Sequence, residues 1–156
     1  MKNYTLGFMF SENKQEVLLI QKDRLEWQAG KLNGIGGKQE PNDSTSLDTQ
    51  IREFKEETGI DTKISDWELF CIIDGTETEN KTGTKIGSTY RIYCYKAFNN
   101  SLYDARVVET EIPMVLDLFN PEREDHIKYF PILPNVNWLI PMALTTVNQV
   151  LQIKYN

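Results

Sequence analysis

Residues 36–60 read GGKQEPNDSTSLDTQIREFKEETGI. The first half of this stretch holds two glycines, a proline and a run of Asn, Asp, Ser and Thr, which favour loops because they tolerate or stabilise turns. After the loop, apolar-face residues recur at helical spacing: Leu47, Ile51, Phe54 and Thr58. The pattern predicts a helix over 47–58, with an N-cap among residues 44–46 and an end at Gly59.

Glu53, Glu56 and Glu57 share one arc of this helix beside its apolar face. Arg52 stands four residues before Glu56, so the two can pair along the helix surface. The cluster lies at the C-terminal end of the helix, where the helix dipole disfavours carboxylates. Two interpretations follow: a solvated acidic face, or carboxylates that bind a hard cation such as Mg²⁺, which is often shared with substrate phosphates. The glycine loop directly before the helix favours the cation.

The rest of the chain alternates strand-like and helix-like segments, as in an α/β or α+β sandwich. Strands are expected over residues 4–10, 16–21, 67–73, 89–98 and within 107–119, the first two forming a hairpin. The C-terminal stretch 137–153, NWLIPMALTTVNQVLQI, has the apolar spacing of a helix and predicts one with Pro141 in its first turn. The polar connection 74–88 is interpreted as a lid, a dimer contact or a disordered loop.

The composition is that of one globular domain: 156 residues, 40% hydrophobic and 26% charged. A net charge of −6 argues against nucleic-acid binding but allows a phosphate-bearing small molecule if a cation is present. No apolar run would span a membrane, and the first residues lack the features of a signal peptide. Cys71 and Cys94 lie in strand-like segments and predict buried thiols in a reducing compartment. We therefore expect a cytoplasmic single domain over 1–156, without nucleic acid or membrane as partner, and either monomeric or homodimeric.

The stretch 36–60 resembles the Nudix box, whose pattern is G, five residues, E, seven residues, then R-E-apolar-x-E-E-x-G-apolar. Gly37 matches the opening glycine, and residues 52–60 match every specified position of the second half. The middle departs from the pattern. Asp43 stands where the first Glu is expected, and eight residues instead of seven separate it from Arg52. One residue is inserted in the loop or at the start of the helix, which leaves the role of Asp43 open.

The resemblance implies a mixed β-sheet between helices, with the box as a loop-helix-loop motif, and hydrolysis of a nucleoside diphosphate linked to another group. It assigns Glu53, Glu56 and Glu57 as ligands of Mg²⁺, with Mn²⁺ as an alternative. It assigns Arg52 to orienting a glutamate and places the backbone of Gly37 near the metal. These roles suit the chemistry, because phosphoanhydride hydrolysis needs a neutralised substrate and a positioned water.

Residues outside the box complete the predicted site. Members of this family often recruit a further acid from a later loop as a base or metal ligand, and Glu111 is our candidate, followed by Glu109. The alternative is that both are surface acids. Lys22, at the end of a strand before the loop, and Gly36 and Gly37 in the glycine loop are candidate contacts of the substrate.

The segment WQAGKLNGIGGK, residues 27–38, resembles the matching stretch of Nudix enzymes that hydrolyse oxidised purine nucleoside triphosphates. In those enzymes an Asn ahead of the paired glycines contacts the base edge, so the resemblance assigns this role to Asn33; alternatively, Asn33 only stabilises the loop. A second resemblance, in LPNVNWLIP, puts Asn135 and Asn137 where Asp is expected. Trp27 and Trp138 are either base-stacking residues or part of the core.

The markers of other Nudix subfamilies are absent downstream of the box. No proline occurs between Ile60 and Pro113, where ADP-ribose hydrolases tend to have one, and the tyrosine of dinucleoside polyphosphate hydrolases is also missing. We expect cleavage of a nucleoside triphosphate, ordinary or oxidised like 8-oxo-dGTP, to monophosphate and pyrophosphate. ADP-ribose or another nucleoside-diphosphate conjugate is the alternative substrate. A nucleotide-binding sensor without turnover is the alternative function.

Overall fold

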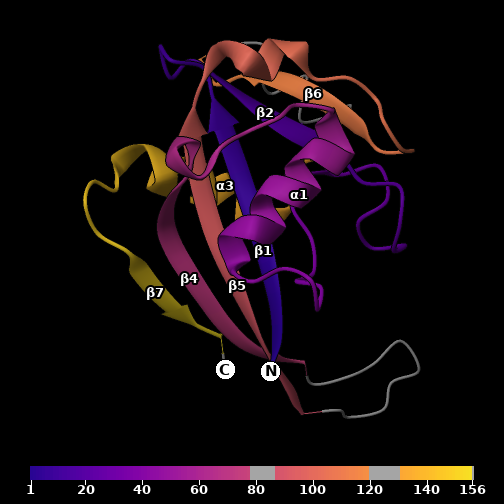
Figure 1. Cartoon of the computed structure of the whole chain (residues 1–156), viewed down its shortest axis with the longest axis vertical. Helices are drawn as coiled ribbons and strands as arrows, with labels where there is room; N and C mark the ends of the chain where they lie inside the picture. The colour runs from indigo at the N-terminus through magenta and orange to yellow at the C-terminus, as the bar shows by residue number, and fades with distance from the viewer. Residues whose placement is uncertain (78–86, 120–130, 156) are drawn as a thin grey trace.

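The computed structural model describes residues 1–77, 87–119 and 131–155, which form a mixed β-sheet with one helix on each face (Figure 1). The strands are β1 (Lys2–Phe10), β2 (Glu16–Gln21), β3 (Leu32–Asn33), β4 (Glu68–Glu77), β5 (Ser88–Phe98), β6 (Ile112–Asp117) and β7 (Leu151–Lys154). The helices are α1 (Ser46–Thr58) and α3 (Pro134–Thr145), with short 3₁₀ turns at Ile64–Asp66 and Asn100–Asp104. The predicted α/β sandwich and the mixed sheet between helices are confirmed.

The sheet has the strand order β3-β2-β1-β5-β4-β7. β1 and β2 form the predicted antiparallel hairpin, with Met9 opposite Leu18, and β1 runs parallel to β5 over its whole length. One edge of β2 is shared by β1 and β3, whereas β6 pairs with β2 from Glu16 to Gln21 and so occupies the other edge. This branching brings the start of β6 beside the end of β2.

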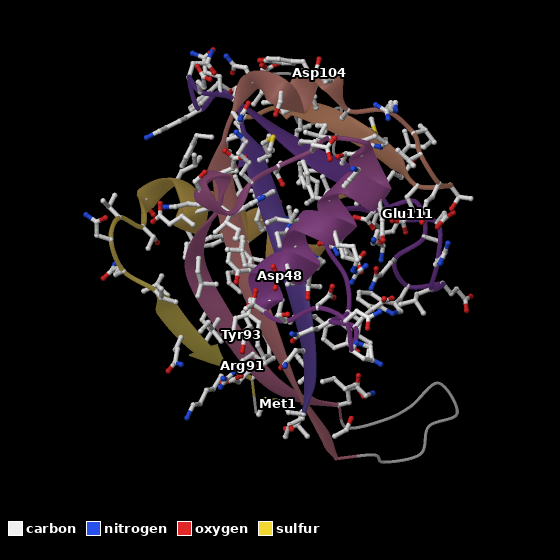
Figure 2. All side chains as sticks on the ribbon, viewed as in Figure 1. Met1, Asp48, Arg91, Tyr93, Asp104 and Glu111 are labelled. Carbon is white, nitrogen blue, oxygen red and sulfur yellow. The ribbon has the colours of Figure 1, made fainter. Side chains whose placement is uncertain are left out.

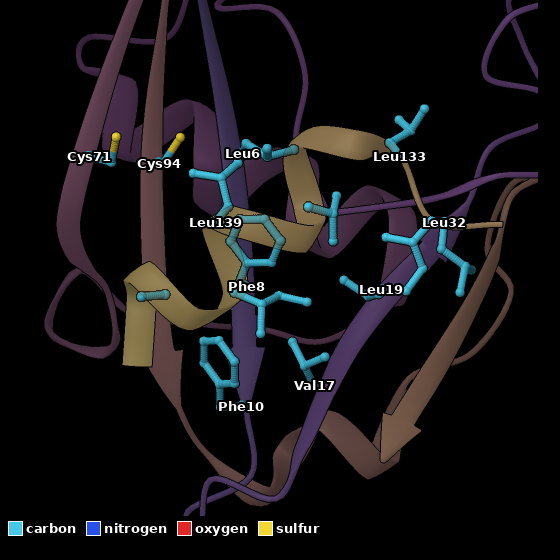
Figure 3. Close-up of a cluster of buried hydrophobic side chains, with 14 of the residues drawn as sticks. Leu6, Phe8, Phe10, Val17, Leu19, Leu32, Cys71, Cys94, Leu133 and Leu139 are labelled. Atoms are coloured by element: carbon cyan, nitrogen blue, oxygen red, sulfur yellow. The ribbon is translucent and has the colours of Figure 1, made fainter. Parts of the chain in front are cut away.

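Side chains of β1 alternate between two cores because successive residues of a strand point to opposite faces. Phe8 and Phe10 face a cluster that includes Leu139 of α3, and Figure 3 shows this cluster with the two cysteines on neighbouring strands. Met9 faces a second cluster that includes Phe54 of α1. Phe8, Met9, Phe10, Phe54 and Leu139 are all fully buried. Each helix is therefore fixed to the sheet by its own apolar core.

Local signals fix both ends of α1. Thr45 is the N-cap; its side chain accepts the backbone N–H of Asp48, whose carboxylate accepts the N–H of Thr45 in a capping box. Gly59 ends the helix in the left-handed conformation with φ 74°, which glycine adopts without a Cβ penalty. Inside the helix, Phe54 packs edge-on against Trp67 with ring centroids 5.0 Å apart. Both predicted helix ends are confirmed, and this packing sets which side of α1 faces the sheet.

The predicted C-terminal helix over 137–153 is wrong in both its bounds. α3 begins at Pro134, so Pro141 lies in the helix interior instead of its first turn, and the helix ends at Thr145. Asn148 follows with φ 54°, and residues 151–154 form β7, parallel to β4. The apolar spacing after Thr145 therefore belongs to a strand that packs on the same core.

Other expectations have mixed outcomes. Cys71 and Cys94 are confirmed as free, buried cysteines. Residues 107–119 hold one strand, β6. Most of the 74–88 connection lies outside the described residues, so the three interpretations of that loop stay predictions. Among the described helices, none combines the length and apolarity needed to cross a bilayer.

Candidate active site

The predicted acids gather around one hollow of about 360 Å³ at the C-terminal end of α1. Figure 2 shows Glu111 beside this end of the helix, whereas Asp48 marks the opposite end. The hollow is lined by the box helix, the loop after β2 and the residues before β6. Seven predicted site residues line it: Lys22, Gly36, Gly37, Glu53, Glu56, Glu57 and Glu111. The structure therefore brings the candidate later acid to the same place as the box glutamates.

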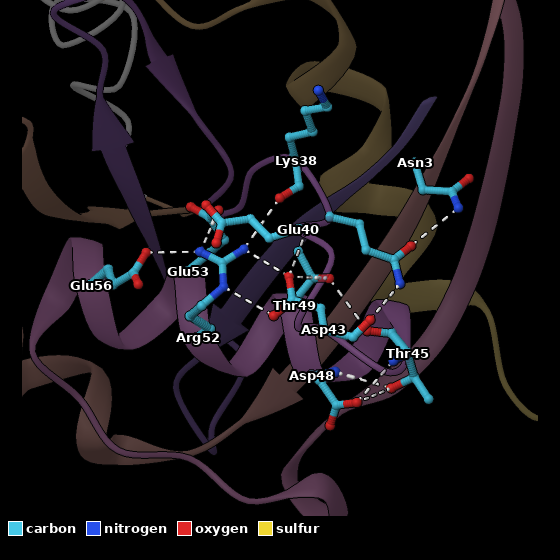
Figure 4. A network of polar contacts seen from close by, with 11 residues as sticks. Asn3, Lys38, Glu40, Asp43, Thr45, Asp48, Thr49, Arg52, Glu53 and Glu56 are labelled. Atoms are coloured by element: carbon cyan, nitrogen blue, oxygen red, sulfur yellow. Dashed lines mark hydrogen bonds and ion pairs between the residues drawn. The ribbon is translucent and has the colours of Figure 1, made fainter. Parts of the chain in front are cut away.

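Arg52 is the centre of a polar network on the exposed side of α1 (Figure 4). Its Nη1 donates to Glu53 at 2.8 Å and to Glu56 at 2.9 Å, so the predicted pairing of Arg52 with Glu56 is confirmed. The Asp43 carboxylate is the main cause that raises the pKa of Arg52, and Glu53 adds to the rise. Arg52 therefore fixes the side chains of two box glutamates from within their own helix.

Asp43 binds the other side of the same guanidinium. Its two carboxylate oxygens accept from Arg52 Nε at 3.1 Å and Nη2 at 2.9 Å, a bidentate pair. Asp43 also accepts from the Thr49 hydroxyl and from the backbone N–H of Glu40, and Arg52 is the main cause that lowers the pKa of Asp43 to about 2. The extra residue of the box does not interrupt α1, which is continuous from Ser46 to Thr58. In this chain Asp43 positions Arg52.

Lys22 joins α1 to the strand β6. Its ammonium lies 3.1 Å from Glu57 Oε1 and 2.8 Å from Glu111 Oε2. The β2–β6 ladder ends with Gln21 opposite Ile112, which places Lys22 and Glu111 next to each other directly beyond the last pair. All three charged side chains are largely buried, with 10–14% of each exposed. This buried triad was not predicted, because its members are 35 and 89 residues apart.

The triad holds one positive charge against two carboxylates, and the pKa values reflect this imbalance. Burial raises the pKa of Glu57 to about 8, the neighbouring Glu111 adds to the rise, and Lys22 opposes it. Burial also raises the pKa of Glu53, against the pull of Arg52. Lys22 itself has a raised pKa, because its two carboxylate partners outweigh the burial of the ammonium. The site therefore favours added positive charge, either a proton or a metal cation.

The glycine loop approaches the glutamates closely. A Cβ on Gly37 would lie 2.5 Å from the Glu53 carboxylate, so only glycine fits without displacing that side chain. The backbone N–H of Gly36 donates to Glu57 Oε2 at 3.2 Å. Both predicted glycine positions thus touch the carboxylates of the box through backbone atoms.

A metal ion would have to enter a site whose carboxylate charges are now balanced by lysine and arginine side chains. Within residues 1–77, 87–119 and 131–155, no three acidic, histidine or cysteine side chains are grouped as a ready metal site. The reason is visible in the contacts, because Lys22 separates Glu57 from Glu111 and Arg52 holds Glu53 and Glu56. The donors nevertheless fit a hard cation: they are carboxylate oxygens around one hollow, and one positive group already lies between two of them.

The predicted base-contacting residues lie elsewhere, and their roles stay predictions. The hollow of the glutamates, as the described residues form it, is not lined by Trp27, Asn33, Asn135 or Trp138. Asn33 Oδ1 accepts the N–H of Gly34 at 2.9 Å, an interaction that stabilises the loop. Trp27 is 61% exposed, whereas Trp138 packs against the core of α3 and lines a separate hollow with β7.

Asn33 and Asn135 do come from adjoining segments. The N–H of Leu133 donates to the carbonyl of Leu32 at 2.9 Å, so the start of α3 is hydrogen-bonded to β3. Sequence reasoning also missed three residues of the loop after β2 that line the hollow of the glutamates: Arg24, Leu25 and Gln28. Only their position just after Lys22, on a loop that follows a strand, could have indicated them.

Comparison with known proteins agrees with this geometry. The family model of the NUDIX domain matches residues 2–132. The chain therefore belongs to the NUDIX domain family, the Nudix hydrolases, as its box predicts. No curated protein matches the chain significantly.

Solved structures of similar fold share little sequence with this chain. The crystal structure of a mutator MutT protein from Bacillus halodurans has a TM-score of 0.66 and 21% identity, with 100% of this chain and 91% of that chain covered. The NUDIX domain of Shewanella oneidensis NrtR, complexed with ADP ribose, has a TM-score of 0.60 and 18% identity, with 91% and 85% covered. The solution structure of the E. coli ORF135 protein has a TM-score of 0.57 and 17% identity, with 92% and 89% covered. At these identities the likeness shows the Nudix fold alone.

Proposed function

We propose that this protein is a Mg²⁺-dependent pyrophosphohydrolase that cleaves a nucleoside triphosphate to the monophosphate and pyrophosphate. The observation that carries the proposal is the meeting of Glu53, Glu56, Glu57 and Glu111 around one hollow that also contains basic side chains. Buried like charges are costly unless a cation is bound there. A hollow with both signs of charge suits a substrate that enters as a metal-phosphate complex.

The residues of the hollow have separate roles in this proposal. Glu53, Glu56 and Glu57, with the backbone of Gly37, would hold Mg²⁺, or Mn²⁺ in its place. When bound, the metal would neutralise phosphate charge and favour attack by water. Glu111 would act as the base that accepts the proton of this water, or as a further ligand. Arg52 and Asp43 position the glutamates without contacting the substrate.

Basic side chains of the same hollow would bind the phosphate chain. Three basic residues line the hollow: Lys22 and Arg24 after β2, and Lys38 in the loop before the box helix. Trp27 and Asn33, with Asn135 and Trp138 at the far end of the chain, are our candidates for contacts with the base. The resemblance of residues 27–38 to enzymes of oxidised purine nucleotides supports an 8-oxo-purine triphosphate as one substrate to test.

The test is a nucleotide panel with Mg²⁺, with and without EDTA, and identification of products by mass. The panel holds ordinary and 8-oxo deoxynucleoside triphosphates, ADP-ribose, NADH and a diadenosine polyphosphate. Monophosphate and pyrophosphate are expected from triphosphates, and EDTA should abolish both. Glu57→Gln should lower kcat by about 10²-fold or more, whereas Glu40→Gln, an exposed glutamate of the same box, should not. Full activity of Glu57→Gln would refute the assignment of the metal site.

A nucleoside-diphosphate conjugate such as ADP-ribose is the second candidate substrate, since a NUDIX domain of the same fold is known with ADP ribose bound. Cleavage of ADP-ribose alone would keep the metal site and replace the substrate. A sensor without turnover is less consistent with the sequence, because all three glutamates of the box are present. Cytoplasmic location, the absence of nucleic-acid partners and a monomeric or homodimeric state complete the proposal.

A further inference from the structure

The ammonium of Lys22 lies between two carboxylates that reach the hollow from different elements. Glu57 comes from the last turn of α1, and Glu111 comes from the residue before β6. We propose that Lys22 is an internal counter-ion that competes with the divalent cation for these two carboxylates and leaves them when the cation binds. This inference rests on the metal-dependent function proposed above and concerns how the metal enters.

The distances show that the ammonium occupies one oxygen of each acid, Glu57 Oε1 and Glu111 Oε2. Lys22 Nζ is 3.1 Å from Glu57 and 2.8 Å from Glu111, which are hydrogen-bond distances to an ammonium. Mg²⁺ needs oxygen ligands at about 2.0–2.1 Å, so a metal that binds these same two oxygens would take the space that Nζ now occupies. Two positive groups at that separation would also repel each other in a largely buried site. A metal bound to these two oxygens therefore requires the ammonium to move.

The backbone at Lys22 is built so that only the side chain needs to move. Its N–H donates to the carbonyl of Lys31 at 2.9 Å, and its own carbonyl accepts the N–H of Gly30 at 2.8 Å. These bonds fix the start of the loop after β2 from both sides. The four-carbon side chain of lysine can turn about its own bonds without breaking them.

The displaced ammonium stays within the same hollow, where a phosphate would replace the lost carboxylates as its partner. Metal binding and phosphate binding are then coupled, because each favours the side-chain position that the other needs. The loss of Lys22 should remove the competition. It should also leave two buried carboxylates without their cation. A bound metal should therefore stabilise the variant more than it stabilises the natural protein.

The experiment compares Lys22→Met with the natural protein by calorimetric titration with Mg²⁺ and by electron paramagnetic resonance with Mn²⁺, both without nucleotide at pH 8.5. Lys22→Met should bind either ion about tenfold more tightly, because a charged hydrogen bond no longer competes. The rise in melting temperature on adding Mg²⁺ should also be larger. Lys38→Met is the matched control, since it removes a positive charge from the same hollow. Among the described residues Lys38 forms no ion pair, so its change should alter metal affinity far less.

The outcomes separate this inference from the proposed function. Equal metal affinities of Lys22→Met and the natural protein, or equal effects of Lys22→Met and Lys38→Met, would overturn the competition and leave the hydrolase proposal standing. Failure of both proteins to bind either ion would overturn both proposals. If Lys22→Met does not fold, Lys22→Gln removes the charge but keeps a hydrogen-bond donor, and it should show the same direction of change in metal affinity.

Discussion

Replacing Asp43 by Asn tests whether this aspartate takes the place of the first glutamate of the box. The change keeps the size of the side chain but removes the charge that binds Arg52 through two hydrogen bonds. The pKa of Asp43 is lowered from 3.8 to about 2, and its side chain is only 7% exposed. Each pKa unit corresponds to about 1.4 kcal/mol, so Asp43→Asn should lower the free energy of unfolding by about 2 kcal/mol at pH 7.

The same pair predicts how this difference depends on pH. Because the folded-state pKa of Asp43 lies below that of the unfolded chain, its carboxylate stabilises the fold above about pH 4. That contribution is lost as the pH falls toward 2. The gap in unfolding free energy between the two proteins should therefore be constant from pH 7 to pH 5. It should shrink to about half at pH 3.

Urea denaturation of both proteins at several pH values measures this gap. Asp61→Asn is the matched control, because Asp61 pairs with Lys55 of the same helix at 2.7 Å but is 80% exposed. An exposed pair contributes little, so the control should change the unfolding free energy by less than about 0.5 kcal/mol. Equal stabilities of Asp43→Asn and the natural protein, or a gap that does not change with pH, would refute the role assigned to Asp43.

Three further predictions follow from packing, burial and exposure. Phe54→Ala should lower the free energy of unfolding by about 3–5 kcal/mol, because Phe54 is fully buried. Ile64→Ala, at an exposed position, should lower it by less than about 0.5 kcal/mol. Similar urea midpoints of the two variants would contradict the packing of α1. Lys96→Met should cost about 1–3 kcal/mol, because buried Lys96 donates to two carbonyls at the end of α3, and unchanged thermal unfolding would contradict this. Trp27→Ala should raise KM about tenfold with kcat unchanged if the indole stacks on the base, and an unaltered KM would exclude that contact.

The box helix could be predicted from sequence because its signals are local. The cap at Thr45, the apolar spacing through Phe54 and the stop at Gly59 all lie within the helix or one residue from it. The pairing of Arg52 with Glu56 is equally local, one turn of helix apart. Such features depend on short-range geometry that the order of residues fixes directly.

The end of α3 could not be predicted in the same way. Residues 137–153 keep an apolar spacing that suits a helix, yet the helix ends at Thr145. Lys96, a buried residue of β5, donates to the carbonyls of Ala143 and Thr146 and so satisfies groups that a longer helix would have bonded internally. This partner lies about 50 residues away in the sequence, where no local pattern records it.

The charge balance of the site shows the same division between local and distant causes. Three glutamates at the C-terminal end of α1 are unfavourable for the helix, both from mutual repulsion and from its dipole. The sequence shows the repulsion and one remedy, Arg52, but Arg52 reaches only Glu53 and Glu56. Glu57 is balanced instead by Lys22 from the end of β2, and this lysine is shared with Glu111. Glu57, the most buried carboxylate of the cluster, thus depends on a cation that the fold supplies. Because one ammonium faces two carboxylates, the site keeps an affinity for a second cation.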